Sequence, residues 1–326
     1  MASHSTMVPW PPLPLAPWRA TYHALHMATQ IVGKTLLALA SPQNHWWHSA
    51  LRVSARGLAS ASPLREGERA LDVELDLVDH VLSVRRSDGR AATLPLVARP
   101  VHAFYDAYAA ALRGLDLDVH LWTTPVEVVD PVPFDRDDAP GAYDREAAGR
   151  FWEVLRRCDG ALRDLSNAYL GKQSPVHFFW GSFDLAVTRF SGRRAPERPG
   201  ADPVTREAYS HEVISFGFWP GGATPAGVQV DEPVLYAYAA PEPAGFRGAS
   251  VSPAAARYDE RLGEFVLPYE AVRTARDPAA EVRAFCEDVY AAGATLGGWD
   301  RHALERAPER STERAPAPHD GPHPNP

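Results

Sequence analysis

The chain contains 326 residues, of which 45% are hydrophobic, and its formal net charge at pH 7 is −8. This length and apolar fraction suffice for one large core or two moderate ones. The acidic balance argues against a broad nucleic-acid or anionic-membrane surface, since both need clustered lysine and arginine. Cys158 and Cys286 fall at inward-facing positions of helical patterns. Two such thiols argue against a disulfide framework and favour a reducing compartment. No apolar run approaches the roughly 20 residues that span a bilayer. We therefore expect a soluble cytoplasmic protein.

Residues 1–17 form a proline-rich N-terminal arm, which we expect to be extended. The arm lacks the basic start and the uninterrupted apolar segment of a secretory signal. Its PxxP spacings are compatible with a ligand for a polyproline-binding domain. The simpler interpretation is that Trp10 and Leu13 pack onto the domain that follows.

The first predicted half of the protein, residues 18–124, opens with a long helix. Apolar residues recur at steps of three, four and seven from Arg19 to Ala40. The segment Ala28–Thr35 within it loosely matches a phosphate-binding loop ending in Gly33-Lys34. Such a loop needs a preceding strand and a flexible glycine-rich turn, and the pattern provides neither. We therefore predict no nucleotide binding at this position.

Short strands follow this helix. Residues 70–78 are the clearest, because leucine and valine alternate there with three carboxylates, as in a sheet with one solvated face. Other strands of this half are predicted at 51–55, 81–86, 93–97 and 118–122. Pro100 is placed to open a helix between the last two of these strands.

The most informative stretch is Ser174–Arg193, SPVHFFWGSFDLAVTRFSGR. A linker rich in proline and aspartate, residues 125–143, and a helix that Asp144 can cap precede it. Its first part has the composition of a loop, and its second part alternates like a strand. In a regular strand Asp184 and Arg189 would lie on opposite faces.

The second predicted half spans residues 144–304. Beyond the central stretch, strands are predicted at 211–218, 234–239 and 264–268, and Asp277-Pro278 supplies the cap and first turn of a closing helix. Residues 305–326 have low complexity, and we expect this tail to be disordered.

Both halves follow the order helix, strand meander, helix, which suggests an internal duplication. We align Gly33-Lys34 and His45 with Gly171-Lys172 and His177, which places residues 51–55 on 183–187. The expected fold is α+β, with two similar halves, each helix–antiparallel strand meander–helix, packed as one globular unit. A cleft between the halves is the expected ligand position.

Four segments carry a resemblance to a known family: HFFWGSFDLAVTRFSGR (177–193), YSHEVISFGFWPG (209–221), NHWWH (44–48) and DEPVLYAYAAPEP (231–243). Through these segments the chain resembles, over about residues 10–304, an uncharacterised bacterial family known as domain of unknown function 5996. The resemblance implies one continuous globular unit and a cytoplasmic bacterial protein. It implies no particular activity.

Histidines and carboxylates near the aromatic segments are the candidates for chemistry. The predicted catalytic residues are His177, Asp184, His211 and Glu212, acting in proton transfer or holding a metal. His45 and His48 are further metal candidates if the chain turns between them. His211-Glu212 begins like a zinc-protease motif but lacks the second histidine. A hydrogen-bonded structural position is the alternative for each histidine, and the pattern specifies neither a metal nor a cofactor.

A second set of residues is predicted to bind a ligand: Trp46, Trp47, Phe179, Trp180, Arg189 and Trp219. Aromatic side chains near polar groups are more numerous here than a plain core requires, which favours an aromatic-lined pocket. Asp184 lies in an otherwise apolar strand, so it needs a partner or a shifted pKa. Its candidate partners are Arg189 after a bulge and His211 on a neighbouring strand.

Three functions therefore stay open. The first is an enzyme that acts on a small polar metabolite in the aromatic cleft, and the second is a non-catalytic protein that binds a small molecule there. The third is a structural or partner-binding protein that uses its proline-rich arm. We rank the small-molecule cleft first and the enzyme ahead of the binder, and we expect neither nucleic-acid nor membrane partners. The pattern does not specify the oligomeric state.

Overall fold

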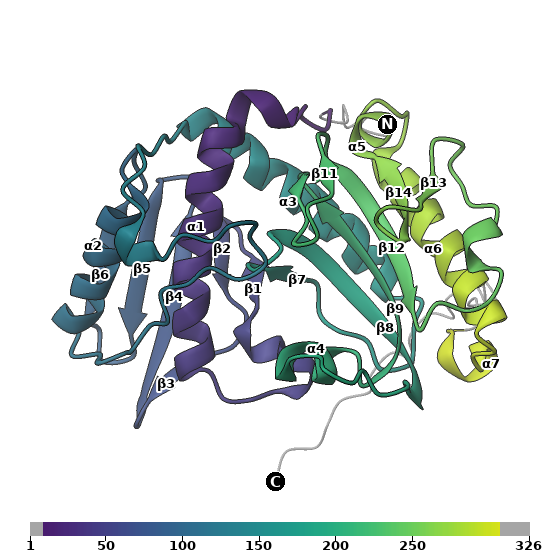
Figure 1. Ribbon diagram of the computed structural model, residues 1–326, viewed down its shortest axis with the longest axis horizontal. Coiled ribbons are helices and arrows are strands. Elements are labelled where there is room, and N and C mark those ends of the chain that lie inside the picture. Colours follow the sequence, from purple (N-terminus) through teal and green to yellow (C-terminus); the bar gives the residue numbers. More distant parts are fainter. Residues whose placement is uncertain (1–8, 307–326) are drawn as a thin grey trace, which may run out of the picture.

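The computed structural model describes residues 9–306 and has the predicted α+β architecture (Figure 1). The α-helices are α1 (Leu15–Leu39), α2 (Val101–Gly114), α3 (Arg145–Ser166), α4 (Pro203–Ala208), α5 (Tyr269–Arg273), α6 (Pro278–Leu296) and α7 (Arg301–Leu304). Short 3₁₀ helices are η1 (Asn44–Ser49), η2 (Phe134–Arg136) and η3 (Phe246–Gly248). The first strands are β1 (Leu51–Val53), β2 (Gly57–Ser60), β3 (Leu64–Glu66), β4 (Arg69–Asp76), β5 (Val81–Arg86) and β6 (Ala91–Pro95). The later strands are β7 (His177–Phe179), β8 (Asp184–Arg194), β9 (His211–Trp219), β10 (Gly222–Ala223), β11 (Gln229–Val230), β12 (Val234–Ala240), β13 (Arg257–Asp259) and β14 (Glu264–Pro268).

One antiparallel sheet runs through the described chain in the order β13-β14-β12-β9-β8-β7-β1-β2-β4-β5-β6, with β3 paired to β4. Strands β10 and β11 form a separate pair. The central strands β1 and β7 meet at Leu51 and Phe178. Counted outward from this pair, β1 occupies the position equivalent to β7. The predicted match of residues 51–55 with 183–187 stays a prediction, and it compares β1 with the start of β8, since residues 184–187 belong to β8. The three-residue strand β7 lies within the segment interpreted as a loop.

Helices α3 and α6 begin where the sequence supplies both an apolar stripe and a capping aspartate. Asp144 accepts hydrogen bonds from the backbone N–H groups of Glu146 and Ala147 at the start of α3, and Asp277 accepts one from Ala280 at the start of α6. Such caps satisfy N–H groups that have no partner within the helix. Helix α3 packs on β8, β9 and β1, and α6 packs on β9 and β12 (Figure 1). One face of the second-half strands is thus covered by helices.

In the described part of the N-terminal arm, Trp10 and Leu13 pack as the simpler interpretation predicts, residues 15–17 belong to α1 and are not extended, and residues 1–8 lie outside the described residues. Trp10 and Leu13 are buried, and the Tyr269 hydroxyl donates to the Pro11 carbonyl at 2.8 Å. At the other end, the backbone of Arg306 donates to Ala168 at 2.9 Å. Apart from Glu305 and Arg306, the predicted disordered tail lies outside the described residues.

Two expectations about local structure have opposite outcomes. The strand predicted at 118–122 is wrong: the segment is irregular, and its alternation reflects the burial of Leu121, next to the buried Leu117, without a paired strand. Gly33-Lys34 lies inside α1, so no phosphate-binding loop forms there.

No helix within residues 9–306 combines the length and apolarity needed to cross a membrane.

Arg189 joins the sheet to both covering helices. It is 3% exposed, and its Nη2 donates to the Leu165 carbonyl of α3 at 2.7 Å. Its guanidinium carbon lies 4.5 Å from the ring centroid of Tyr290 in α6 and 4.9 Å from that of Tyr169. A planar guanidinium satisfies these stacking and hydrogen-bonding contacts at once.

Replacement of this buried cation is expected to destabilise the fold. Arg189→Ala removes one donor from the Leu165 carbonyl and opens a void between two tyrosines, which should lower the free energy of unfolding by about 3 kcal/mol. Urea denaturation followed by circular dichroism measures the change. The control is Arg194→Ala in the same strand, an exposed position where a change within about 0.5 kcal/mol is expected. Equal effects at the two positions would contradict the anchoring role of Arg189.

Candidate functional site

A cavity of about 800 Å³ lies against the face of the sheet opposite α3 and α6. Strands β8, β9 and β12 form its floor, and α1, η1, residues 122–127 and α4 cover it. In Figure 1, α4 lies between the lower end of α1 and the lower ends of β8 and β9. The covering segments come from both sides of the 125–143 linker and from the linker itself. The volume falls within the range of small-molecule sites, roughly 300–1,000 Å³.

The alternation of β8 determines which residues reach this cavity. Asp184, Ala186 and Thr188 line it, whereas Arg189 points into the helix-covered side. The prediction that Asp184 and Arg189 lie on opposite faces is thereby confirmed. Arg189 accordingly does not line the cavity.

Five of the predicted site residues line the cavity: Trp46, Trp47, Phe179, Trp180 and Asp184. The sequence prediction missed further aromatic residues of the wall, which are Trp122, Phe190, Tyr209, Tyr236 and Tyr238. Two of these, Tyr236 and Tyr238, alternate in the segment VLYAYAA, a signal that predicts side chains on one face of a strand. The other three come from separate parts of the chain and meet only in the fold.

Strained backbone concentrates around the cavity. Among the described residues, those other than glycine with positive φ include His45 (58°), Trp46 (62°), Glu127 (57°) and Phe183 (62°). The first three line the cavity, and Phe183 lies between the lining residues Ser182 and Asp184. Left-handed backbone costs about 1–3 kcal/mol for such residues and gathers at functional sites. The strain here turns side chains of η1 and of the β7–β8 turn toward the cavity.

Asp184 is the carboxyl group of the cavity floor. It is 7% exposed, and its two oxygens accept hydrogen bonds from the hydroxyls of Ser182 and Tyr236. No basic side chain in the described part of the chain contributes to its electrostatics, and burial raises its pKa against the opposing effect of the two hydroxyls. The predicted pairing of Asp184 with Arg189 or His211 is therefore wrong, because hydroxyl groups take that place.

The charge of Asp184 contributes to raised pKa values at two more carboxyl groups. Glu127 is surrounded by protein, but its side chain remains accessible from the cavity. Desolvation, followed by repulsion from Asp184 and Asp202, raises the pKa of Glu127 to about 7. Burial, followed by Asp184 and Asp259, raises the pKa of Glu264 to about 8. Groups with such pKa values can both give and take protons near neutral pH.

Lys34 brings an amine to the same cavity. The residue is 4% exposed. Its Nζ lies 4.8 Å from the ring centroid of Trp122 and 5.5 Å from that of Trp180. This Nζ has no hydrogen-bond partner among the described residues. Burial lowers its pKa to about 8. The preceding Gly33 permits this approach, since a Cβ there would lie 2.2 Å from the Trp180 ring.

His45 connects η1 to α4 and to a second lysine. Its Nδ1 lies 3.0 Å from the Glu207 carbonyl, which can only accept, so Nδ1 carries the proton. Its Nε2 then accepts from Lys172 Nζ at 2.6 Å. Burial, with Lys172 next, lowers the pKa of His45. The His45 backbone N–H also donates to the Glu207 carboxylate at 3.0 Å, so that two hydrogen bonds hold α4 against η1.

The remaining predicted residues lie outside the cavity lining. His177 is buried, and its Nδ1 has no hydrogen-bond partner among the described residues. Its ring centroid lies 6.2 Å from that of Trp47 and 5.9 Å from that of Phe179. Burial lowers the pKa of His177 to about 4. His211 contacts the Ser210 hydroxyl at 3.0 Å, and Glu212 accepts from Arg193 and Ser191. Trp219 lies at the far end of β9 near Gly222. Of the predicted catalytic residues, the structure therefore brings Asp184 alone to the wall of the cavity.

No group of three or more histidine, cysteine, aspartate and glutamate side chains within residues 9–306 is arranged to hold a metal ion. His45 and His48 bind different partners, since His48 Nδ1 accepts from the Gln43 backbone at 3.1 Å.

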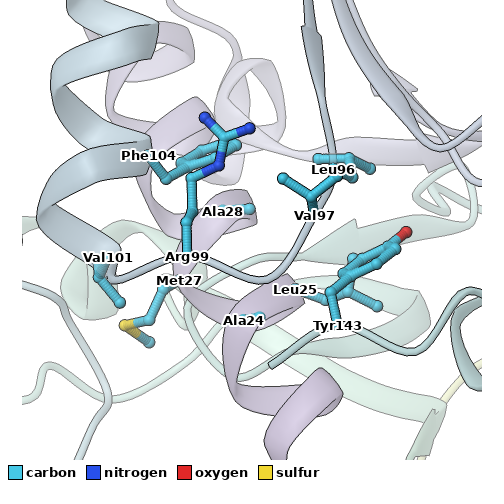
Figure 2. Close-up of a pocket in the computed structure, with 10 residues that line it drawn as sticks. All are labelled: Ala24, Leu25, Met27, Ala28, Leu96, Val97, Arg99, Val101, Phe104 and Tyr143. Carbon is cyan, nitrogen blue, oxygen red and sulfur yellow. The ribbon is translucent and has the colours of Figure 1, made fainter. Parts of the chain in front are cut away.

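A second, smaller pocket lies between α1 and the start of α2 (Figure 2). Its volume is about 30 Å³, and apolar side chains such as Leu25, Met27 and Phe104 line it. This space corresponds to about one water molecule. It is a packing gap of the core and is too small for an organic ligand.

The raised carboxyl pKa values have a spectroscopic consequence. Because Glu127 and Glu264 hold protons below about 7 and about 8, respectively, the infrared carbonyl band of a protonated carboxylic acid should persist at pH 6 and disappear as the pH rises to 9. Glu127→Gln and Glu264→Gln should each remove part of this band. The same change at the exposed Glu146 is the control. An unchanged band in both the Glu127 and the Glu264 variant would show that neither group holds its proton.

Comparison with known proteins gives a family without an assigned role. A family model described as a family of unknown function (DUF5996) matches residues 10–306. No curated protein and no solved structure matches the chain.

Proposed function

We propose that this chain, which belongs to the family of unknown function DUF5996, binds a small organic molecule in the aromatic cavity and exchanges a proton with it through Asp184. The single observation that carries the proposal is the position of this carboxyl group. It lies on the wall of a ligand-sized cavity, buried, with two hydroxyl donors and no ion-pair partner within residues 9–306. Perturbed carboxyl groups in clefts are typical of acid–base catalysis.

The wall also indicates the class of ligand. Indole and phenol rings supply most of its large surfaces, which favours a ligand with a flat, apolar body. The polar groups gather at Ser182, Asp184 and Tyr236, which favours a hydroxyl, carbonyl or amine group at one end of that body. Few other positions of the lining carry a charge, so we expect ligands of low net charge.

A non-catalytic binding protein is the second candidate. Both Asp184 oxygens already accept hydrogen bonds, and in this second role the carboxylate holds the Ser182 and Tyr236 hydroxyls in place beside a bound molecule. In this case the ligand would leave the protein unchanged. The two candidates share the cavity and differ in whether Asp184 is needed for turnover or for binding geometry.

The relation between the halves supports the cleft as the ligand position. We infer that the halves arose by duplication, because the sheet order is symmetric about β1 and β7 and a long helix precedes each of these strands. A cavity covered by segments of both halves would then be a property of the pair. We also propose a cytoplasmic location, since Cys158 and Cys286 are both buried and free.

Blocking the cavity is the direct test of ligand binding. Ala186 lines the cavity floor, and Ala186→Leu places additional carbon atoms in the space without adding charge. A panel of small aromatic alcohols, amines and carbonyl compounds is screened by thermal unfolding, where a ligand at 100 times its dissociation constant adds about 2.7 kcal/mol. We expect stabilisation of the wild type by some members and its loss in Ala186→Leu.

Ala110→Leu, at an exposed position of α2, is the matched control and should bind as the wild type does. A hit that binds Ala186→Leu equally well would place the ligand elsewhere. For each true hit, Asp184→Asn separates the candidates: retained binding with lost conversion of the compound supports the enzyme, and binding without conversion by the wild type supports the binder.

A further inference from the structure

Lysine is nearly absent from this chain. The sequence contains 33 lysine and arginine residues, and only Lys34 and Lys172 among them are lysines. Arginine therefore serves at the other basic positions, including all the ion pairs that the described residues form with carboxylates. Arginine stays protonated in proteins, whereas lysine can lose its proton and act as a nucleophile. The two positions that keep an amine deserve a chemical explanation.

One of the two lysines lines the cavity, and the other contacts a residue of its wall. Lys34 lines it directly, and Lys172 donates to His45, which also lines it. Their settings differ. Lys172 is exposed and its Nζ is engaged by His45 at 2.6 Å, while the Nζ of Lys34 is buried and has no hydrogen-bond partner within the described residues.

The surroundings of Lys34 fit a nucleophile better than a structural cation. A buried ammonium normally pairs with a carboxylate or with several acceptors, because desolvation of an unpaired charge is costly. The Nζ of Lys34 lies instead over the faces of Trp122 and Trp180. Desolvation lowers its pKa to about 8, so a substantial fraction of the side chain is free amine in mildly basic solution.

We propose that Lys34 attacks the carbonyl carbon of an aldehyde or ketone bound in the cavity and forms an imine with it. The inference rests on the proposed small-molecule cavity and adds the class of its ligand. The nitrogen lone pair adds to the carbon, the carbonyl electron pair moves to oxygen, and the nitrogen loses a proton while the oxygen gains one, which gives a neutral carbinolamine. The oxygen then takes a second proton and leaves as water while the nitrogen lone pair forms the C=N bond, and loss of the remaining N–H proton gives the neutral imine.

The cavity supplies groups suited to these proton transfers. Glu127 lines the same cavity and titrates near neutral pH, and Asp184 lies on its floor. The rings of Trp122 and Trp180 keep bulk water from the amine, which favours imine over hydrolysis. No oxidant, metal or further co-reactant is required, since imine formation is a condensation.

Reductive trapping with benzaldehyde tests the inference. The wild-type protein is incubated with benzaldehyde and sodium cyanoborohydride, which reduces an imine to a stable benzylamine, and peptide mass spectrometry compares the extent of benzylation at Lys34 and Lys172. We expect Lys34 to react at least tenfold faster than Lys172, with a rate that rises as the pH passes through about 8. Equal or slower labelling of Lys34 would overturn the inference, since the exposed Lys172 is an internal reference in the same molecule.

Variants separate the inference from the proposal on which it rests. Lys34→Arg keeps the positive charge and should lose only the fast labelling, while Lys172→Arg should keep it. Ala186→Leu narrows the cavity and should slow labelling at Lys34 but not at Lys172. Slow labelling of Lys34 in a protein that still binds the screened alcohols would refute the imine alone. Fast labelling that Ala186→Leu leaves unchanged would contradict the cavity itself.

Discussion

The short antiparallel contact between β1 and β7 is the joint on which the molecule depends. These strands have three residues each and meet at a single registered pair, Leu51 and Phe178. This contact turns two strand meanders into one continuous sheet. It also brings η1, which directly precedes β1, to the edge of the second-half strands. Without this joint, the cavity would lose its cover and the floor of β8, β9 and β12 would be open to solvent.

The electrostatic character of the cavity follows from its enclosure. A carboxyl group that leaves water without a cation gains a raised pKa, and an amine in the same situation gains a lowered one. Asp184, Glu127 and Lys34 show these opposite shifts around one space. The cavity thus favours the neutral forms of these groups more than bulk water does. Neutral acids and bases are what proton transfer and carbonyl addition need.

The parts of this site that local patterns encode could be predicted, and the parts that depend on long-range packing could not. Alternation in β8 places Asp184 and Arg189 on opposite faces, and the aromatic segments around Trp46 and Trp180 predict a pocket wall. The partners of Asp184 were missed because Tyr236 lies 52 residues along the chain. The sequence pattern did not predict Lys34 as a site residue. Its burial beneath Trp122 depends on a segment that follows α2 and contacts α1 only in the fold. The scarcity of lysine was the one sequence signal that pointed to it.

The attachment of α4 bears on how fast molecules enter and leave. The sheet floor is held by regular strand pairing, and α1 is fixed by its contact with Trp180. The cover formed by α4, by contrast, is tied to η1 by two hydrogen bonds between His45 and Glu207. Separation of α4 from η1 would break these two hydrogen bonds and open this side of the cavity to solvent, while the strand pairing of the floor stayed intact.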